Sequence, residues 1–234
     1  MSEQILLPLV HKGTMIKVSC DLENTGKSLN ETQISVIYSR IKTSLEDISK
    51  SGNIKLDFIY SRNYLIFQSN NLKYFFGPQI SLCYSFMIYP DWDESHFYWA
   101  DYLGAGASNI VTIGLKNGDE WFTSLKIPVF SLYSRPDDYR LYKMEDSSPT
   151  GVIRALHSGI GAGSWNRVFQ LNLNSEYRFT VLQNKRNARK YSIDFIRKSR
   201  TEAFTYSFDF IRISKKGEQA FIQITNQLGL KLMF

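Results

Sequence analysis

The densest positive charge in the chain lies just before and within a repeated aromatic segment near the C-terminus. Seven basic residues fall within sixteen positions and are opposed only by Asp194. Lysine and arginine at this density can neutralise phosphates, while nearby tyrosine or phenylalanine can stack on exposed bases. The predicted nucleic-acid contacts are Lys185, Arg186, Arg189 and Lys190, with Arg197, Lys198 and Arg200 as secondary contacts.

No aromatic RNA-recognition motif and no zinc finger accompanies this cluster. The pattern therefore predicts contact with the nucleic-acid backbone without reading of the base sequence. Binding of that kind falls steeply as the salt concentration rises. The alternative is a basic face that is merely solvated.

A nearly exact repeat is expected to position this charge. Residues Tyr191–Ser199 recur fifteen positions later as Tyr206–Ser214, with seven of the nine positions identical. Both copies are rich in aromatic and β-branched residues and alternate with a period of two. We predict two antiparallel neighbouring strands joined by a turn at Arg200–Thr205. Their aromatic side chains are interpreted as a buried face, with Asp209 on the outer face beside arginine or lysine.

The overall charge is uneven along the chain. Residues 151–234 contain 14 Lys and Arg against 5 Asp and Glu, whereas residues 1–150 contain 14 against 17. This asymmetry indicates either a polyanionic partner on the C-terminal side or a surface that is simply basic.

The composition favours a soluble β-rich protein in a reducing compartment. Aromatic residues make up 15% of the 234 residues, which suits sheet faces. Cys20 and Cys83 are too few for a disulfide framework. The N-terminus carries Glu3 where a signal peptide has a base, and no run approaches eighteen apolar residues, so we expect neither secretion nor a transmembrane segment.

Catalytic motifs are not recognisable. His11, His96 and His157 stand in unrelated segments, and no nucleophile motif accompanies them. Gly159–Ser164 follows a predicted helix instead of leading from a strand into one, so it reads as a connection and not as a phosphate loop. The sequence predicts no enzyme activity and no cofactor.

One acidic run could bind a metal. Asp91, Asp93 and His96 are suitable ligands, but the run lacks the glycine and the distal glutamate of a calcium loop. Capping of a short helix through residues 97–103 is the favoured interpretation.

Two further helices are expected among many short strands. Isoleucine and leucine at helical spacing after Asn30 predict an amphipathic helix near residues 31–50. Ser148 followed by Pro149 starts a short second helix. Ser61–Asn63 and the Asn-Gly step before Asp119 are read as hairpin turns.

The number of short strands predicts an all-β protein, a jelly-roll-like antiparallel β-sandwich. Gly104–Ser108 marks a possible boundary between an N-terminal segment, 1–108, and a basic sandwich, 109–234. A single domain over 1–234 is the close alternative.

A family resemblance covers residues 114–198. Gly118-Asp119 precedes the predicted strand Trp121–Tyr133, and a strand ending in Glu145-Asp146 runs into a Pro-Thr loop and a short helix. An Arg-Phe-x-Val-Leu-x-x-Lys strand follows at Arg178–Lys185. In this order the elements resemble the coat proteins of small icosahedral viruses, those of satellite tobacco necrosis virus type and of circular single-stranded DNA viruses.

This resemblance implies a single jelly roll, self-assembly into a homo-oligomeric shell and a basic inner surface facing the genome. It also implies a location in the virion and in the cytoplasm or nucleus of a host cell. That family usually begins with an arginine-rich arm, whereas this chain begins with an acidic segment, and residues 1–108 have no counterpart.

The sequence therefore leaves two functional hypotheses. The first is a viral coat protein that contacts nucleic acid electrostatically. The alternative is a β-sandwich binding or pore-forming protein that acts on a membrane or glycan through aromatic loops, for instance Trp92 with Phe97, Tyr98 and Trp99.

Overall fold

The computed structural model describes residues 12–25, 28–42, 50–88, 96–135, 142–143, 148–156, 160–181, 200–214 and 221–233. Strands dominate these ranges and join into one antiparallel sheet. The elements are β1 (Lys12–Thr25), β2 (Ser28–Lys42), β3 (Lys50–Gln68), β4 (Leu72–Ile88), β5 (His96–Gly114), β6 (Glu120–Ser134), β7 (Tyr142–Lys143), α1 (Pro149–Leu156), β8 (Gly161–Ser164), β9 (Val168–Val181), β10 (Arg200–Ile213) and β11 (Phe221–Met233).

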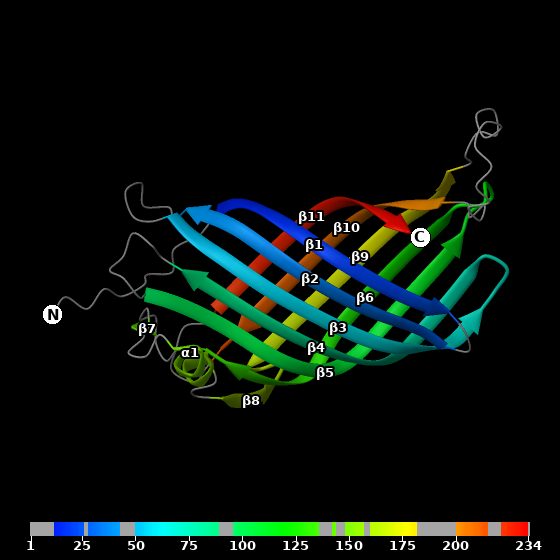
Figure 1. Ribbon diagram of the computed structural model, residues 1–234. Helices are drawn as coiled ribbons and strands as arrows, with labels where there is room; N and C mark the ends of the chain where they lie inside the picture. The colour runs from blue at the N-terminus through cyan, green and yellow to red at the C-terminus, as the bar shows by residue number, and fades with distance from the viewer. Residues whose placement is uncertain are drawn as a thin grey trace, which may run out of the picture.

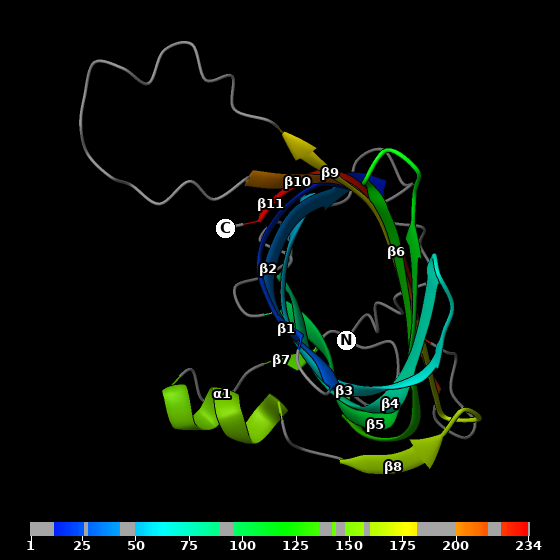
Figure 2. The same ribbon diagram turned by 90° about the vertical axis from the view of Figure 1, so that its right-hand side faces the viewer.

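The sheet follows the order of the chain and curls on itself. Its path is β1-β2-β3-β4-β5-β6-β9-β10-β11, with β7 paired to β5 and β8 paired to β6. Figure 1 shows the long tilted strands side by side, and Figure 2 shows them curving round a central interior. The helix α1 and the strand β8 lie outside this ring (Figure 2). The sheet therefore has an inner face and an outer face.

The predicted all-β, antiparallel, sandwich-like class is confirmed, and two local predictions hold as well. The helix α1 begins at Pro149, and Ser148 Oγ accepts a hydrogen bond from the N–H of Gly151 at 3.1 Å, as a capping residue should. The Asn117-Gly118 step forms the β5–β6 hairpin, and Gly118 has a φ of 88°, which glycine adopts without a steric penalty.

The amphipathic helix predicted near residues 31–50 is wrong, because β2 is a strand that pairs with both β1 and β3. Ile34 and Val36 lie on the outer face, whereas Ser35 and Ser39 are buried on the inner face. β-Branched residues and two neighbouring ladders favour the extended chain over a helix here. The helical spacing of isoleucines was outweighed by an alternation of period two within the same residues.

Two predicted interruptions lie within strands. Ser61–Asn63 continues β3, where both end residues are fully buried and Asn63 Nδ2 donates to Ser61 Oγ at 3.0 Å. Gly104–Ser108 lies within β5, which pairs with β4 and β6 on either side of it. A Cβ on Gly106 would lie 2.1 Å from the carbonyl oxygen of Ile127, so this glycine allows close approach of two backbones.

Buried apolar residues form two small clusters. One joins Leu29, Ile110 and Phe122, with Phe75 packed against it. The other consists of Cys83, Ala100, Tyr102, Tyr133, Val168, Ile211 and Ile213. In the described ranges, no helix has both the length and the apolar character that a membrane-spanning helix requires.

Candidate functional site

Strand β10 contains the second copy of the aromatic repeat and shows how the sheet distributes its side chains. Phe204 and Tyr206 are 58% and 41% exposed on the outer face, whereas Asp209 is 7% exposed on the inner face. Asp209 accepts a hydrogen bond from Asn172 Nδ2, so its predicted outer pairing with a basic residue is wrong. The predicted burial of the repeat aromatics is also wrong for this copy. The first copy, Tyr191–Ser199, lies outside the described residues.

The predicted hairpin between the two copies is corrected too. Arg200–Thr205, predicted as the turn, is the first part of β10 and pairs with β9. The other neighbour of β10 is β11. The second copy therefore lies between two strands of different sequence.

The outer face carries large apolar side chains on the other strands as well. They recur at every second position, as side chains on one face of a strand must. The exposed members on four of these strands are Ile16, Val18 and Leu22 of β1, Ile34, Val36 and Tyr38 of β2, Ile54, Leu56, Phe58 and Tyr60 of β3, and Ile222, Ile224, Leu228 and Leu230 of β11.

The inner face is buried and largely polar, with the two small apolar clusters lying among its polar residues. Its residues occupy the alternate positions of the same strands and include serine, asparagine, glutamine and charged side chains. The buried members are Ser35, Ser39, Asn53, Lys55, Ser61, Asn63, Gln79, Ser81, Ser85, Ser108, Ser124, Lys126, Ser131, Gln170, Asn172, Glu176, Asp209 and Thr225. A protein in water normally buries its apolar residues and exposes its charged ones, so this distribution is reversed.

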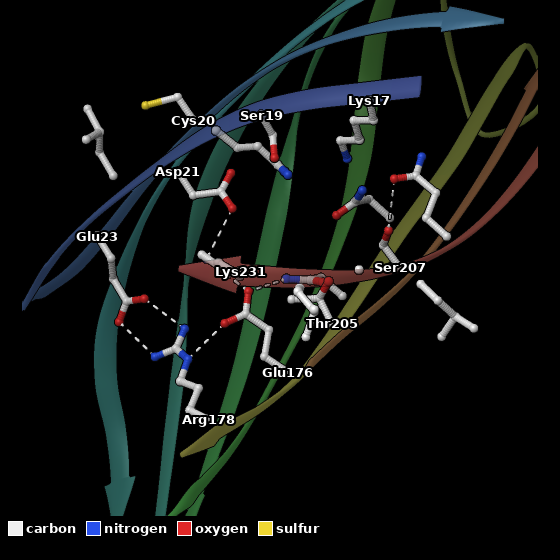
Figure 3. Close-up of a pocket in the computed structure, with 18 of the residues that line it drawn as sticks. Lys17, Ser19, Cys20, Asp21, Glu23, Glu176, Arg178, Thr205, Ser207 and Lys231 are labelled. Atoms are coloured by element: carbon white, nitrogen blue, oxygen red, sulfur yellow. Dashed lines mark hydrogen bonds and ion pairs between the residues drawn. The ribbon is translucent and has the colours of Figure 1, made fainter. Parts of the chain in front are cut away.

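Ion pairs neutralise the buried charges on one side of the interior (Figure 3). Arg178 contacts Glu23 at 2.8 Å and Glu176 at 2.8 Å. Lys231 contacts Glu176 at 3.0 Å and Asp21 at 3.1 Å. Because a buried charge is costly without a partner, these contacts make the polar interior possible. They also connect β9 and β11 with β1.

Two further ion pairs lie in the interior. Lys55 Nζ lies 3.1 Å from Asp57 Oδ2, and Lys126 Nζ lies 3.2 Å from Glu31 Oε2. The two lysine side chains are only 4% and 5% exposed. Both lysines are therefore enclosed together with their carboxylate partners.

A cavity of about 1020 Å³ lies between β1 and the strands β9, β10 and β11. Its polar lining includes Lys17, Asp21, Asn172, Thr205 and Lys231, several of which Figure 3 shows around one space. Amides, hydroxyls and charges of both signs face the cavity. Such a lining can bind a polar group through hydrogen bonds and charge.

The cavity lies at the place where the sheet path begins and ends. Strands β1 and β11 are the two ends of that path, and within the described residues no backbone ladder joins them. Lys231 and Asp21 connect them through side chains instead. We call this gap between β1 and β11 the seam.

An aromatic row crosses the outer face near the β5–β6 hairpin. Ring centroids are 6.1 Å apart for Trp121 and Tyr177, and 5.4 Å apart for Phe179 and Phe204. The hydroxyl of Tyr177 donates to Asp119 in the hairpin. Each tyrosine or tryptophan in such a row presents an apolar body with a polar tip.

One of the predicted nucleic-acid contacts lies within the described residues. Arg200 opens β10 and pairs with Val181 in the ladder to β9. The others lie outside the described residues and comprise Lys185, Arg186, Arg189, Lys190, Arg197 and Lys198. Their role stays a prediction.

Of the three possible metal ligands, only His96 lies within the described residues. His96 is the first residue of β5, whereas Asp91 and Asp93 lie outside. Where the chain is described, no three His, Cys, Asp or Glu side chains gather as metal ligands would.

The predicted short helix over residues 97–103 is wrong, since these residues belong to β5. Trp99, predicted in an aromatic loop, is fully buried and donates from Nε1 to Ser134 Oγ at 3.2 Å. Trp92 lies outside the described residues. Among the described residues, most exposed aromatic side chains lie on strands, where the period-two alternation was the signal for them; Trp165, in the turn between β8 and β9, is an exception.

No family model, curated protein sequence or solved structure matches the chain. Its function must accordingly be argued from the two faces and the cavity.

Proposed function

We propose that this protein is an integral membrane protein whose curled sheet is inserted in a lipid bilayer with its outer face against the hydrocarbon. The observation that carries the proposal is the reversed polarity, with an apolar outer face and a polar inner face on successive strands. This develops the membrane alternative predicted from the sequence, with strand faces in place of loops as the contact.

Water is a poor environment for this outer face. Ile16, Val18 and Leu228 are 69%, 70% and 86% exposed, and they belong to a band that continues over neighbouring strands. A soluble monomer rarely exposes a contiguous apolar patch larger than a few hundred Å². Lipid removes this penalty, while the polar inner face keeps its charges paired and away from the hydrocarbon.

The height of the apolar band on β10 fits a bilayer. Glu202 and Arg212 flank the outward residues Phe204, Tyr206, Phe208 and Phe210. The ten residue steps between the two charges span about 23 Å along the membrane normal, at about 3.3 Å per residue and a tilt of about 45°. Membrane-inserted strands commonly carry an apolar band about 25 Å tall.

Strand β3 also carries an apolar outer face. Its outward residues Ile54, Leu56, Phe58 and Tyr60 are followed by Arg62, and exposed apolar residues continue beyond it at Tyr64 and Ile66. The aromatic row of Trp121, Tyr177, Phe179 and Phe204 adds a second feature, because aromatic side chains gather where the hydrocarbon meets the headgroups.

The lack of a long apolar run does not conflict with this proposal. A helix needs about twenty apolar residues in succession, but a strand needs only every second residue to be apolar. The packed inner side around Lys55 and Asp57 argues for an anchored sheet with an internal cavity in preference to an open channel.

Reconstitution tests the proposal. The detergent-purified protein should insert into phosphatidylcholine vesicles, float with them, and resist extraction by alkaline carbonate. Brominated acyl chains should quench fluorescence from Trp121, which is 45% exposed. A folded, monodisperse protein in detergent-free buffer that fails to float would overturn membrane insertion.

The coat-protein hypothesis has a separate experiment. Neutralisation of Lys185, Arg186, Arg189 and Lys190 to glutamine should weaken nucleic-acid binding at low salt and flatten its dependence on salt concentration, because each phosphate contact releases counterions. Filter binding at two salt concentrations and the particle size of the purified protein provide the measurements. Unchanged affinity, or a protein that never forms a large closed particle, would count against that hypothesis.

A further inference from the structure

The seam cavity is polar on one side and apolar on the other. Lys17 and Asp21 of β1 face it from the inner side, together with Asn172 of β9. Leu22 and Leu228, which belong to the outer face, also line it and are 63% and 86% exposed. The cavity therefore reaches from the interior to the apolar surface through the gap between β1 and β11.

Two acceptor atoms in this cavity lack a hydrogen-bond donor among the described residues. Asp21 uses Oδ2 for Lys231 and leaves Oδ1 unpartnered. Asn172 donates from Nδ2 to Asp209 and leaves its own Oδ1 unpartnered, although its side chain is only 8% exposed. Because an unpaired buried acceptor is unfavourable, these two atoms call for a ligand that donates hydrogen bonds.

One cationic side chain of the cavity lies outside these ion pairs. Arg178, Lys231, Glu23 and Glu176 satisfy one another through ion pairs. Within the described residues, Lys17 takes part in none of the ion pairs. The remaining groups are thus one ammonium and two acceptors, which complement a ligand carrying both an anionic group and a donor-bearing cationic group.

We propose that the seam binds one zwitterionic membrane lipid with a primary-ammonium headgroup. Its phosphate lies near Lys17, its ammonium donates toward Asp21 Oδ1, and its acyl chains lie along Leu22 and Leu228. This inference rests on the proposed membrane insertion. The lipid would also shield from hydrocarbon the edges of β1 and β11 that have no ladder within the described residues, because free backbone groups are strongly disfavoured there.

Two common lipids differ in the one headgroup property that the proposal requires. Phosphatidylethanolamine and phosphatidylcholine share a phosphate and a net charge of zero, but only the first has N–H donors. We expect the seam to retain phosphatidylethanolamine about tenfold more strongly, the ratio given by loss of one good charge-assisted hydrogen bond. Lipid that co-purifies after detergent exchange, counted by native mass spectrometry, measures this ratio.

Two variants assign the retained lipid to the seam. Lys17→Met and Asp21→Asn should each lower retention of phosphatidylethanolamine. Lys73→Met, which removes an exposed lysine of β4 that does not line the cavity, is the matched control and should leave retention unchanged. Equal loss in Lys73→Met would show that the lipid binds by general charge and would overturn the proposal.

The two cysteines provide an independent measurement. Cys20 is exposed and lines the cavity, whereas Cys83 is buried. Added phosphatidylethanolamine should slow maleimide alkylation of Cys20 in detergent more than phosphatidylcholine does, with Cys83 unreactive throughout. If the protein inserts into vesicles but both lipids bind and protect equally, the lipid site is overturned and membrane insertion stands. If the protein does not insert into either kind of vesicle, both proposals fail together.

Discussion

The β3–β4–β5 wall and the seam between β1 and β11 share one alternation of side chains, yet their interiors differ. Each strand of the wall pairs along both edges, and its inner residues Lys55, Ser61 and Ser81 are at most 3% exposed. Each strand at the seam pairs along one edge in the described residues, and a cavity lies beside it. The comparison indicates that a tightly packed polar interior requires strands that are hydrogen-bonded along both edges. Alternation of polar and apolar side chains is not sufficient.

Removal of a buried lysine should show the largest difference between the two regions. Lys55→Met leaves Asp57 buried without its partner at 3.1 Å, so we expect a loss of about 4 kcal/mol in the free energy of unfolding. Lys17→Met at the seam removes no ion pair among the described residues and should change it by less than about 0.5 kcal/mol. Urea unfolding in phosphatidylcholine vesicles measures both free energies of unfolding. Equal losses in the two variants would show that the wall and the seam do not differ in this respect.

A charge on the outer face should distinguish the centre of the band from its margin. Phe208→Arg places a guanidinium near the middle of the proposed hydrocarbon contact and should cost about 3 kcal/mol in vesicles. Glu202→Arg at the margin should cost less than about 1 kcal/mol. The same pair of variants measured in vesicles of different acyl-chain length would sharpen the band's limits. Similar values for the two variants would argue that lipid does not cover β10.

Glycine replacements should show a smaller contrast. A Cβ on Gly77 would lie 1.9 Å from the carbonyl oxygen of Arg62, so Gly77→Ala must displace backbone and should cost about 2 kcal/mol. A Cβ on Gly229 of β11 would meet only the Thr205 hydroxyl, at 2.9 Å, and that side chain can rotate. We expect Gly229→Ala to cost less than about 1 kcal/mol by the same unfolding measurement. A larger cost at Gly229 would mean that the seam is packed more rigidly than the wall.

Local sequence signals predicted several elements well. Asn117-Gly118 forms its hairpin because glycine accepts the positive φ of the turn, and Ser148 caps α1 as its spacing with Pro149 predicts. The alternation in β10 was also read correctly, with Tyr206, Phe208 and Phe210 on one face. These signals were reliable because each fixes one backbone conformation, whereas the turns predicted at Ser61–Asn63 and Arg200–Thr205 are parts of strands.

The errors arose where a pattern had two solutions. The residues of β2 satisfy a helical spacing of isoleucines and a period of two, and pairing with β1 and β3 selected the strand. In β10 the two faces were separated correctly, but the aromatic one was assigned to the core by analogy with soluble sheets. The seam was not foreseen, because contact between β1 and β11 joins residues about two hundred positions apart.

The sequence by itself determined that the strands have one apolar and one polar side, since a period of two places alternate residues on opposite faces of any sheet. It did not determine which side would be enclosed. Curling of the sheet decided that, because the concave face encloses serines, asparagines, paired charges and two small apolar clusters, while residues such as Phe204 and Leu228 remain outside. The same curling brought the first and last strands together and created the seam cavity, which no local pattern encodes.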